Sequence, residues 1–188
     1  MNGSDLQNEP GAARLPVASS SVVISADVIT QVHGLLGREP RGLRAIAVCD
    51  DQGCPMVIRV ASLVDGKPFP TLFWLVDPAL SLRLDREEAA GLIAEFQALV
   101  DQTESLRSQM VDDHHRHIRL RESYLSAAEE SQLKTRGQWR ALSERGIGGI
   151  GNFDRIRCLH TWYAAHLVEA NTIGRLIDER WGRDSSQV

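Results

Sequence analysis

The sequence has few cysteines, no long apolar run and no excess of basic residues, and each of these absences excludes a class of protein. The 188 residues include only three cysteines, an odd number that argues against a disulfide framework. No apolar run reaches the roughly 20 residues that a helix needs to cross a bilayer. Its 21 basic residues are offset by 25 acidic ones, which gives a net charge of −4, so the chain has no general electrostatic attraction for nucleic acid.

The beginning of the chain also lacks the basic and then apolar stretch of a secretory signal. Residues 1–16 instead read MNGSDLQNEPGAARLP, without an apolar run. Together with the odd number of cysteines, this predicts a reducing compartment. We therefore expect a cytoplasmic protein that does not associate with a membrane and does not have nucleic acid as its partner.

Composition predicts one folded domain between two short tails. Residues 1–22 are rich in Gly, Ser, Asn, Pro and Ala without periodicity, which is typical of a disordered tail. With 43% hydrophobic residues overall, the chain can bury a core, and we expect residues 23–182 to form a single α+β domain. Residues 183–188 are expected to form a C-terminal tail.

The first half of this domain contains strand signals after one short helix. Ser25 is a suitable N-cap for that helix, and Gly37 is a suitable stop. Three runs with strand propensity follow at residues 43–50, 55–64 and 71–76, and short turn sequences separate them. They predict a small antiparallel three-stranded meander with helices packed on one of its faces.

From Pro78 onward the pattern is helical. Residues 101–145 form a long charged segment with few apolar residues per turn, which is typical of a solvated helix or helical hairpin. Within it, the run DDHHRH (112–117) groups three histidines, but its many charged neighbours favour a solvated face over a metal site. After the glycines at 146–151, residues 154–177 are predicted to form the final helix, because apolar residues recur there every three or four positions.

The predicted final helix carries two side chains that bind metals well, Cys158 and His160, near its beginning. Two positions apart in a regular α-helix, they would point about 200° away from each other. They can turn to one point if Cys158 precedes the regular part of the helix. Cys54, in a rigid loop before Pro55, would supply a ligand from a second segment. The alternative interpretation is a small buried cysteine and a hydrogen-bonded histidine.

The segment GIGGIG (146–151) matches the G-x-G-x-x-G pattern of dinucleotide-binding proteins, but no parallel βαβ unit surrounds it. A glycine loop that leads into a helix N-terminus, with arginines close behind, can still hold an anion. The residues of this candidate anion site are Gly148, Gly149, Gly151, Arg155 and Arg157. The alternative, which we favour, is a connection between helices whose glycines adopt positive φ.

Three segments stand out together: GCPMVIRVASLVDGKPFPTLFWLVDP (53–78), GIGGIGNF (146–153) and RCLHTWYAAHLVEANTIG (157–174). As a set they resemble the bacterial family catalogued as domain of unknown function 501. The resemblance extends over about residues 37–177, and its most specific parts are Pro-Phe-Pro-Thr and Cys-Leu-His. The family label implies no activity.

The resemblance does imply a ligand set for the metal site. Cys54-Pro55 corresponds to a Cys-Pro motif of the family, and residues 158–160 correspond to its Cys-Leu-His motif. Many members are expected to carry Thr-Cys-Pro where this chain has Val76-Asp77-Pro78, so Asp77 would be an oxygen ligand in place of a third cysteine. The implied set is Cys54, Asp77, Cys158 and His160, and its mixture of donors suits zinc better than an iron–sulfur cluster.

These features lead to two interpretations of function. We favour a non-catalytic interaction module, stabilised by a structural metal or by its core alone, that presents its charged helices to a protein partner. The reason is that the sequence contains no complete set of catalytic residues. The alternative is an enzyme or binding protein for a small anionic or phosphorylated ligand held at residues 146–151. It requires a concave pocket that includes this loop, whereas the module requires an exposed apolar patch.

Overall fold

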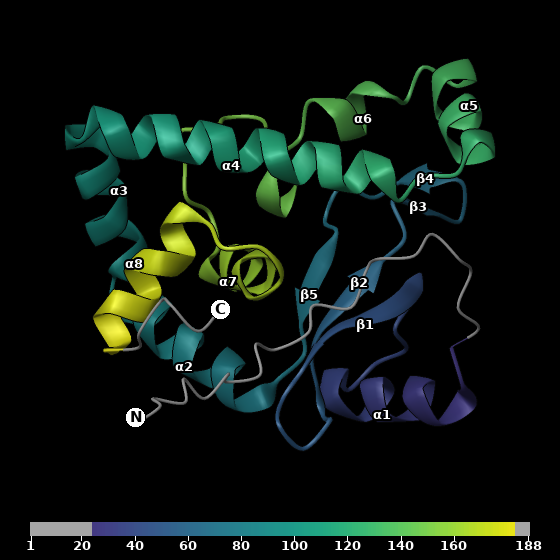
Figure 1. Ribbon diagram of the computed structural model, residues 1–188, viewed down its shortest axis with the longest axis horizontal. Coiled ribbons are helices and arrows are strands. Elements are labelled where there is room, and N and C mark those ends of the chain that lie inside the picture. The colour runs from purple at the N-terminus through teal and green to yellow at the C-terminus, as the bar shows by residue number, and fades with distance from the viewer. Residues whose placement is uncertain (1–23, 183–188) are drawn as a thin grey trace, which may run out of the picture.

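The structure, a computed structural model, describes residues 24–182 and consists of helices around a small sheet (Figure 1). The predicted tails, residues 1–22 and 183–188, lie outside the described residues. Within residues 24–182 there are eight α-helices, one antiparallel sheet of three strands and one pair of very short strands, so the predicted α+β class is confirmed. No helix in this part of the chain is both long and apolar enough to cross a membrane.

The sheet is the antiparallel meander that the sequence predicts, in the order β1-β2-β5. Its strands are β1 (Leu43–Cys49), β2 (Pro55–Val60) and β5 (Phe73–Leu75). The predicted second strand, 55–64, is too long, because β3 (Leu63–Val64) leaves the sheet and pairs with β4 (Lys67–Pro68). Asp65 and Gly66 form the turn between them with φ of 50° and 73°, and positive φ at both positions is the geometry of a tight hairpin.

Helices cover both faces of the sheet, not one as predicted. Side chains alternate along a strand, so Val57 and Phe73 face the core around α7 (Leu159–Val168), while Ile58 points to the other side. There it packs with Val32 of α1 (Ala26–Leu36). Strand β2 is apolar on both faces, and α1 is needed to keep the second face from water.

Local sequence signals set the bounds of α1, as predicted. Ser25 accepts a hydrogen bond from the Val28 amide at 3.3 Å, and Gly37 ends the helix with a φ of 65°. The other helical segments are α2 (Pro78–Ala89), α3 (Leu92–Gln102), α4 (Glu104–Ser123), α5 (Ala127–Thr135), α6 (Arg140–Ser143), the 3₁₀ turn η1 (Ile147–Gly149) and α8 (Thr172–Trp181).

Helix α7 lies at the centre of the molecule (Figure 1). It contacts α8, α2, η1 and all three strands of the sheet. Five consecutive residues, Trp162 to His166, are buried, so the helix has no solvated face along this stretch. Such a helix belongs to the core of a protein, and its stability comes from the elements packed around it.

The predicted final helix, 154–177, is wrong at its start and in its middle. It begins only at Leu159, and it breaks before Asn171, after which α8 folds back against α7. Asn171 stabilises the break on both sides. Its side-chain amide donates to the carbonyl of Trp162 at 3.0 Å, and its side-chain oxygen accepts from the amide of Gly174 at 2.8 Å as the N-cap of α8.

The prediction that residues 112–117 form a solvated face is also wrong. Asp113, His114 and His117 of α4 are buried. The interior provides partners for some of these polar groups: Asp113 accepts two hydrogen bonds, and His114 Nδ1 accepts one from the amide of Ile147 at 2.9 Å. The Nε2 atoms of His114 and His117 are buried without a hydrogen-bond partner among residues 24–182, and the ring of His117 instead packs edge-on against Phe73. Some of the charged and polar residues of α4 are therefore part of the protein interior, and the others lie on the surface.

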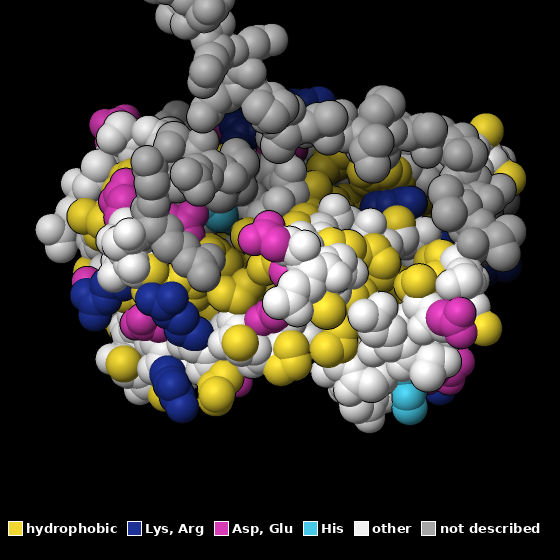
Figure 2. All heavy atoms as spheres, turned by 60° about the horizontal axis from the view of Figure 1, so that its bottom comes forward, with side chains coloured by type: hydrophobic (Ala, Val, Ile, Leu, Met, Phe, Trp, Pro, Cys, Tyr) yellow, Lys and Arg dark blue, Asp and Glu magenta, His cyan; other side chains and the backbone are white. Residues whose placement is uncertain are grey.

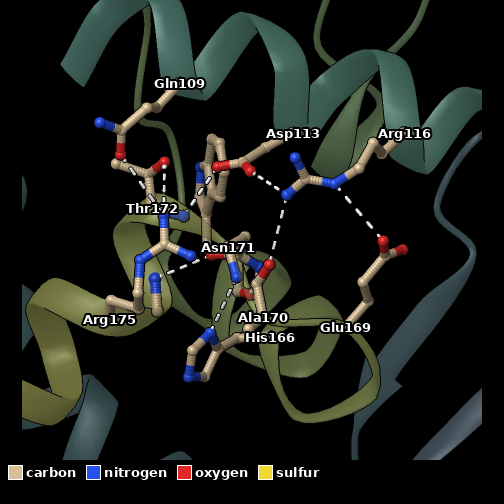
Figure 3. A network of polar contacts seen from close by, with 11 residues as sticks. Gln109, Asp113, Arg116, His166, Glu169, Ala170, Asn171, Thr172 and Arg175 are labelled. Carbon is tan, nitrogen blue, oxygen red and sulfur yellow. Dashed lines mark hydrogen bonds and ion pairs between the residues drawn. The ribbon is translucent and has the colours of Figure 1, made fainter. Parts of the chain in front are cut away.

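Asp113 joins α4 to the turn between α7 and α8 (Figure 3). Its Oδ2 accepts from the Thr172 amide at 2.7 Å, and its Oδ1 accepts from Arg116. Arg116 also donates to the Ala170 carbonyl at 3.3 Å and pairs with Glu169 at 3.4 Å. One carboxylate thus satisfies a free amide at the start of α8 and holds the cation that fixes the preceding turn.

Replacing Asp113 by alanine should destabilise the fold by about 2–3 kcal/mol, because the buried Thr172 amide loses its partner. Urea unfolding followed by circular dichroism measures the change. Asp112→Ala is the matched control, since that carboxylate is exposed and its loss should change the free energy of unfolding by less than about 0.5 kcal/mol. Equal effects of the two substitutions would contradict the role given to Asp113.

The two buried histidines of α4 predict a loss of stability in acid. Burial lowers the pKa of His114 to about 4 and that of His117 to about 3, whereas a histidine of the unfolded chain titrates near pH 6.5. Below about pH 6.5 the unfolded chain therefore binds more protons than the folded one. Stability should fall by up to about 1.4 kcal/mol per pH unit for each histidine until the folded pKa is reached.

Free energies of unfolding measured between about pH 7.5 and pH 4.5 test this dependence. His117→Gln removes one of the two groups and should flatten the curve. His33→Gln, which replaces an exposed histidine of α1, should leave the curve unchanged. If the His117 variant keeps the full slope of the parent protein, burial of His117 is not its cause.

Candidate metal centre and anion pocket

Cys158 and His160 meet at the start of α7. Cys158 is the N-cap residue, with extended backbone angles of φ −157° and ψ 123°, so it precedes the regular helix. The separation of about 200° that a regular helix would impose therefore does not apply. The sulfur of Cys158 lies 3.7 Å from His160 Nδ1. This is the geometry that the sequence analysis required for the two side chains to act together.

The third member of the cluster is Glu88, near the end of α2. Its Oε1 lies 3.2 Å from His160 Nδ1 and accepts a hydrogen bond from the Leu159 amide at 2.6 Å. One donor atom each from Glu88, Cys158 and His160 lies within 4.8 Å of the other two. Glu88 thus contacts both the free amide end of α7 and the two side chains that begin it.

The far side of the His160 ring determines where its protons lie. Nε2 is 3.2 Å from the carbonyl oxygen of Ser81 and 3.3 Å from Asp85 Oδ1. Both atoms can only accept, so Nε2 carries a hydrogen. Nδ1 then faces Cys158 and Glu88, and these contacts raise the pKa of His160 to about 9. A cation is favoured at this point, either a proton on Nδ1 or a metal ion.

Two separations within the cluster are close to the edge lengths of a zinc coordination sphere: one is at the upper end of their range, and the other is about 0.1 Å below its lower end. Zinc binds cysteine sulfur at about 2.3 Å and nitrogen or carboxylate oxygen at about 2.0–2.2 Å, so tetrahedral ligands lie about 3.3–3.7 Å apart. The observed separations are 3.7 Å from Cys158 Sγ to His160 Nδ1 and 3.2 Å from His160 Nδ1 to Glu88 Oε1. Asp85 supplies the outer carboxylate that commonly orients a metal-binding histidine. The residues fit a zinc ion.

Cys54 and Asp77, the other two residues of the predicted ligand set, do not belong to this cluster. Cys54 is exposed, and its amide donates to the Asp50 carboxylate at 2.7 Å in the turn that joins β1 to β2. Asp77 is the N-cap of α2 and accepts from the Leu80 amide at 2.6 Å. Each has a local structural role at the end of an element.

The glycines at 146–151 form a connection of the kind favoured from sequence. Gly148 and Gly149 have φ of 67° and 73°. A Cβ on Gly148 would lie 2.7 Å from Thr161 Oγ1, and one on Gly149 would lie 2.8 Å from Pro70 Cγ, so both positions also need glycine for close packing. The expected helix N-terminus is not at this loop, because the next helix, α7, starts at Leu159.

A pocket of about 1030 Å³ adjoins this connection. Among the predicted anion-binding residues, Gly151, Arg155 and Arg157 line it, and Gly148 and Gly149 do not. Two arginines that the sequence analysis did not select, Arg140 and Arg145, complete the basic lining. The pocket is the concave feature that the small-ligand interpretation requires.

Sequence reasoning missed Glu88 and Asp85 of the metal cluster for a physical reason. The two are three residues apart and therefore share a face of α2, which is a visible signal. Acidic pairs with this spacing are common on solvated helices. Only the packing of α2 against α7 brings this pair to His160.

The fold and the cluster define an α+β protein with Glu, Cys and His side chains gathered at the start of its central helix. The family described as "Protein of unknown function (DUF501)" matches residues 46–179, well over half of the chain, and the protein belongs to this family. The resemblance found in the sequence is thereby confirmed. A search of the curated proteins found no match, and neither did a search of the solved structures.

Proposed function

We propose that this protein is a zinc-binding domain whose ion is held by Glu88, Cys158 and His160. The observation that supports the proposal is the orientation of the His160 ring. Its Nε2 is held by two acceptors, and its Nδ1 points between a sulfur and a carboxylate oxygen at 3.7 Å and 3.2 Å. The lone pair of Nδ1, the sulfur and the carboxylate oxygen all carry negative or partial negative charge, so a cation placed between these three atoms stabilises the arrangement.

Zinc is the ion that suits these donors. One sulfur, one nitrogen and one oxygen ligand match the mixed sets of zinc sites, whereas magnesium and calcium prefer oxygen ligands only. The side chains of His160 and Glu88 are 23% and 26% exposed, so solvent can fill the fourth position. The three cysteines are free thiols, and a cytoplasmic location, which we also propose, would keep Cys158 reduced.

The ion would fasten the end of α2 to the start of α7. These segments are far apart in the sequence, and linking them by metal bonds adds the free energy of binding to that of folding. We therefore propose a structural role for zinc, in a non-catalytic domain that binds a protein partner.

The large hydrophobic residues exposed among residues 24–182 do not form the single apolar patch expected of an interaction module, so the partner surface that we propose is polar. The large hydrophobic residues that are exposed in the described part of the chain, Ile29, Leu82 and Leu99, belong to three different helices. Figure 2 shows hydrophobic side chains interspersed with acidic and basic ones on the face that it presents. A partner would thus be recognised through charged side chains, including those on the outward face of α4, more than through one apolar patch.

Cys158→Ser should release the ion, whereas Cys54→Ser should retain it. The two substitutions are chemically identical, but only Cys158 belongs to the cluster. Protein dialysed against zinc and then against zinc-free buffer is measured by elemental analysis, and cobalt replacement reports the thiolate through its near-ultraviolet absorption. Wild type and Cys54→Ser should each hold one ion per chain. Zinc lost equally from both variants would favour the set that includes Cys54 and would contradict this one.

Glu88→Gln separates the two roles of Glu88. Glutamine keeps an oxygen acceptor for the Leu159 amide but loses the charge that a zinc ligand needs. Zinc affinity should fall, while the metal-free variant should unfold within about 1 kcal/mol of the metal-free parent. If wild type binds no zinc and Glu88→Gln changes nothing, the cluster is only a cap for α7.

A further inference from the structure

The arginine-lined pocket beside the glycine connection is independent of the zinc proposal. Four of its lining residues are Arg140, Arg145, Arg155 and Arg157, and its one carboxylate is Glu144. The lining therefore carries four positive charges and one negative, in a chain whose net charge is −4. Basic residues are therefore concentrated at this pocket although the protein as a whole is acidic. This local positive charge would attract an anion into the pocket.

Two of these arginines are not paired directly with a carboxylate of residues 24–182, although the charge of Arg145 adds to the hydrogen bond from Arg140 in lowering the pKa of the Glu144 carboxyl. Arg140 pairs with Glu144 at 2.6 Å, and Arg155 lies 3.8 Å from Asp101. Across residues 24–182, no carboxylate lies within ion-pair distance of Arg145 or Arg157. Guanidinium groups donate two parallel hydrogen bonds to phosphate oxygens, so these two are the strongest candidates for ligand contacts.

The backbone around the pocket is held in place from inside the protein. The buried guanidinium of Arg121 donates to the carbonyl of Arg145. On the opposite wall, Gln97 donates to the Asp154 carbonyl at 2.9 Å and accepts from the Ile156 amide at 3.0 Å. These contacts fix the segments that carry Arg145 and Arg157 before any ligand arrives, which lowers the entropic cost of binding.

Gly151 lies against the end of the Arg145 side chain. A Cβ at position 151 would be 2.8 Å from Arg145 Nη1, so a larger residue there would displace this guanidinium from its position against the loop. The sequence motif that resembles a dinucleotide fingerprint thus contributes one glycine to the lining of the pocket. Its backbone geometry is unrelated to that of a βαβ unit.

We propose that this pocket binds a small molecule carrying phosphate groups. Its volume of about 1030 Å³ leaves room for a ligand of nucleotide size. Nucleic acid is disfavoured, because its binding uses an extended basic surface that neutralises many phosphates, and this chain is acidic outside the pocket. The ligand class is a phosphorylated metabolite, with its phosphates at Arg145 and Arg157.

Inorganic pyrophosphate and ADP are the probes, and isothermal titration calorimetry at low salt is the measurement. Both should bind the full chain. Arg145→Ala/Arg157→Ala should weaken binding about a hundredfold, which is about tenfold for each charged hydrogen-bonding partner removed. Arg41→Ala/Arg119→Ala is the matched control, because it removes two arginines that are also exposed but do not line the pocket. The control should bind like wild type.

Three results would overturn the proposal. In the first, wild type binds neither pyrophosphate nor ADP at millimolar concentration. Another is equal weakening by the two double substitutions, which would indicate a general effect of charge. The third is tight binding of a single-stranded oligonucleotide that the pocket variant abolishes while neither small probe binds. Circular dichroism of each variant distinguishes loss of the pocket from loss of the fold.

Discussion

Helix α7 is enclosed by other elements, so the free polar groups at its ends must find partners inside the protein. Water, which satisfies most helix ends, has limited access there. At its start, Glu88 of α2 accepts from the Leu159 amide. After its end, Asn171 donates to the Trp162 carbonyl within α7, and Asp113 of α4 accepts from the amide of Thr172, which begins α8. Glu88 thus links α2 to the start of α7, and Asp113 and Asn171 fix the turn from α7 into α8, in addition to the apolar packing.

Local signals in the sequence are sufficient for the elements that depend on their neighbours in the chain. Ser25 and Gly37 bound α1, and strand propensity together with turn sequences predicts the strands, because caps, propensities and turns act over a few residues. The break before Asn171 and the burial of Asp113 depend on contacts between distant segments, and no local pattern reveals them. For the same reason Cys158 and His160 were found in the sequence, whereas Glu88 was not.

The proposed metal centre and the arginine pocket share one short piece of chain. Arg157 lines the pocket, and Cys158, the next residue, belongs to the cluster. Gln97 accepts a hydrogen bond from the Ile156 amide in the non-helical segment that precedes α7, and α7 starts only at Leu159. This late start frees Cys158 to turn toward His160. The non-helical segment before α7 is therefore what allows both sites to exist.

The most direct test of the proposed zinc site uses crystals grown with zinc. Anomalous difference maps are calculated from data recorded on both sides of the zinc absorption edge. We predict one peak bonded to Cys158 Sγ, His160 Nδ1 and a carboxylate oxygen of Glu88, at about 2.0–2.3 Å from each. The Nε2 atom of His160 should remain hydrogen-bonded to Ser81 or Asp85. A peak at Cys54 and Asp77, or none at the start of α7 despite excess zinc, would contradict the account.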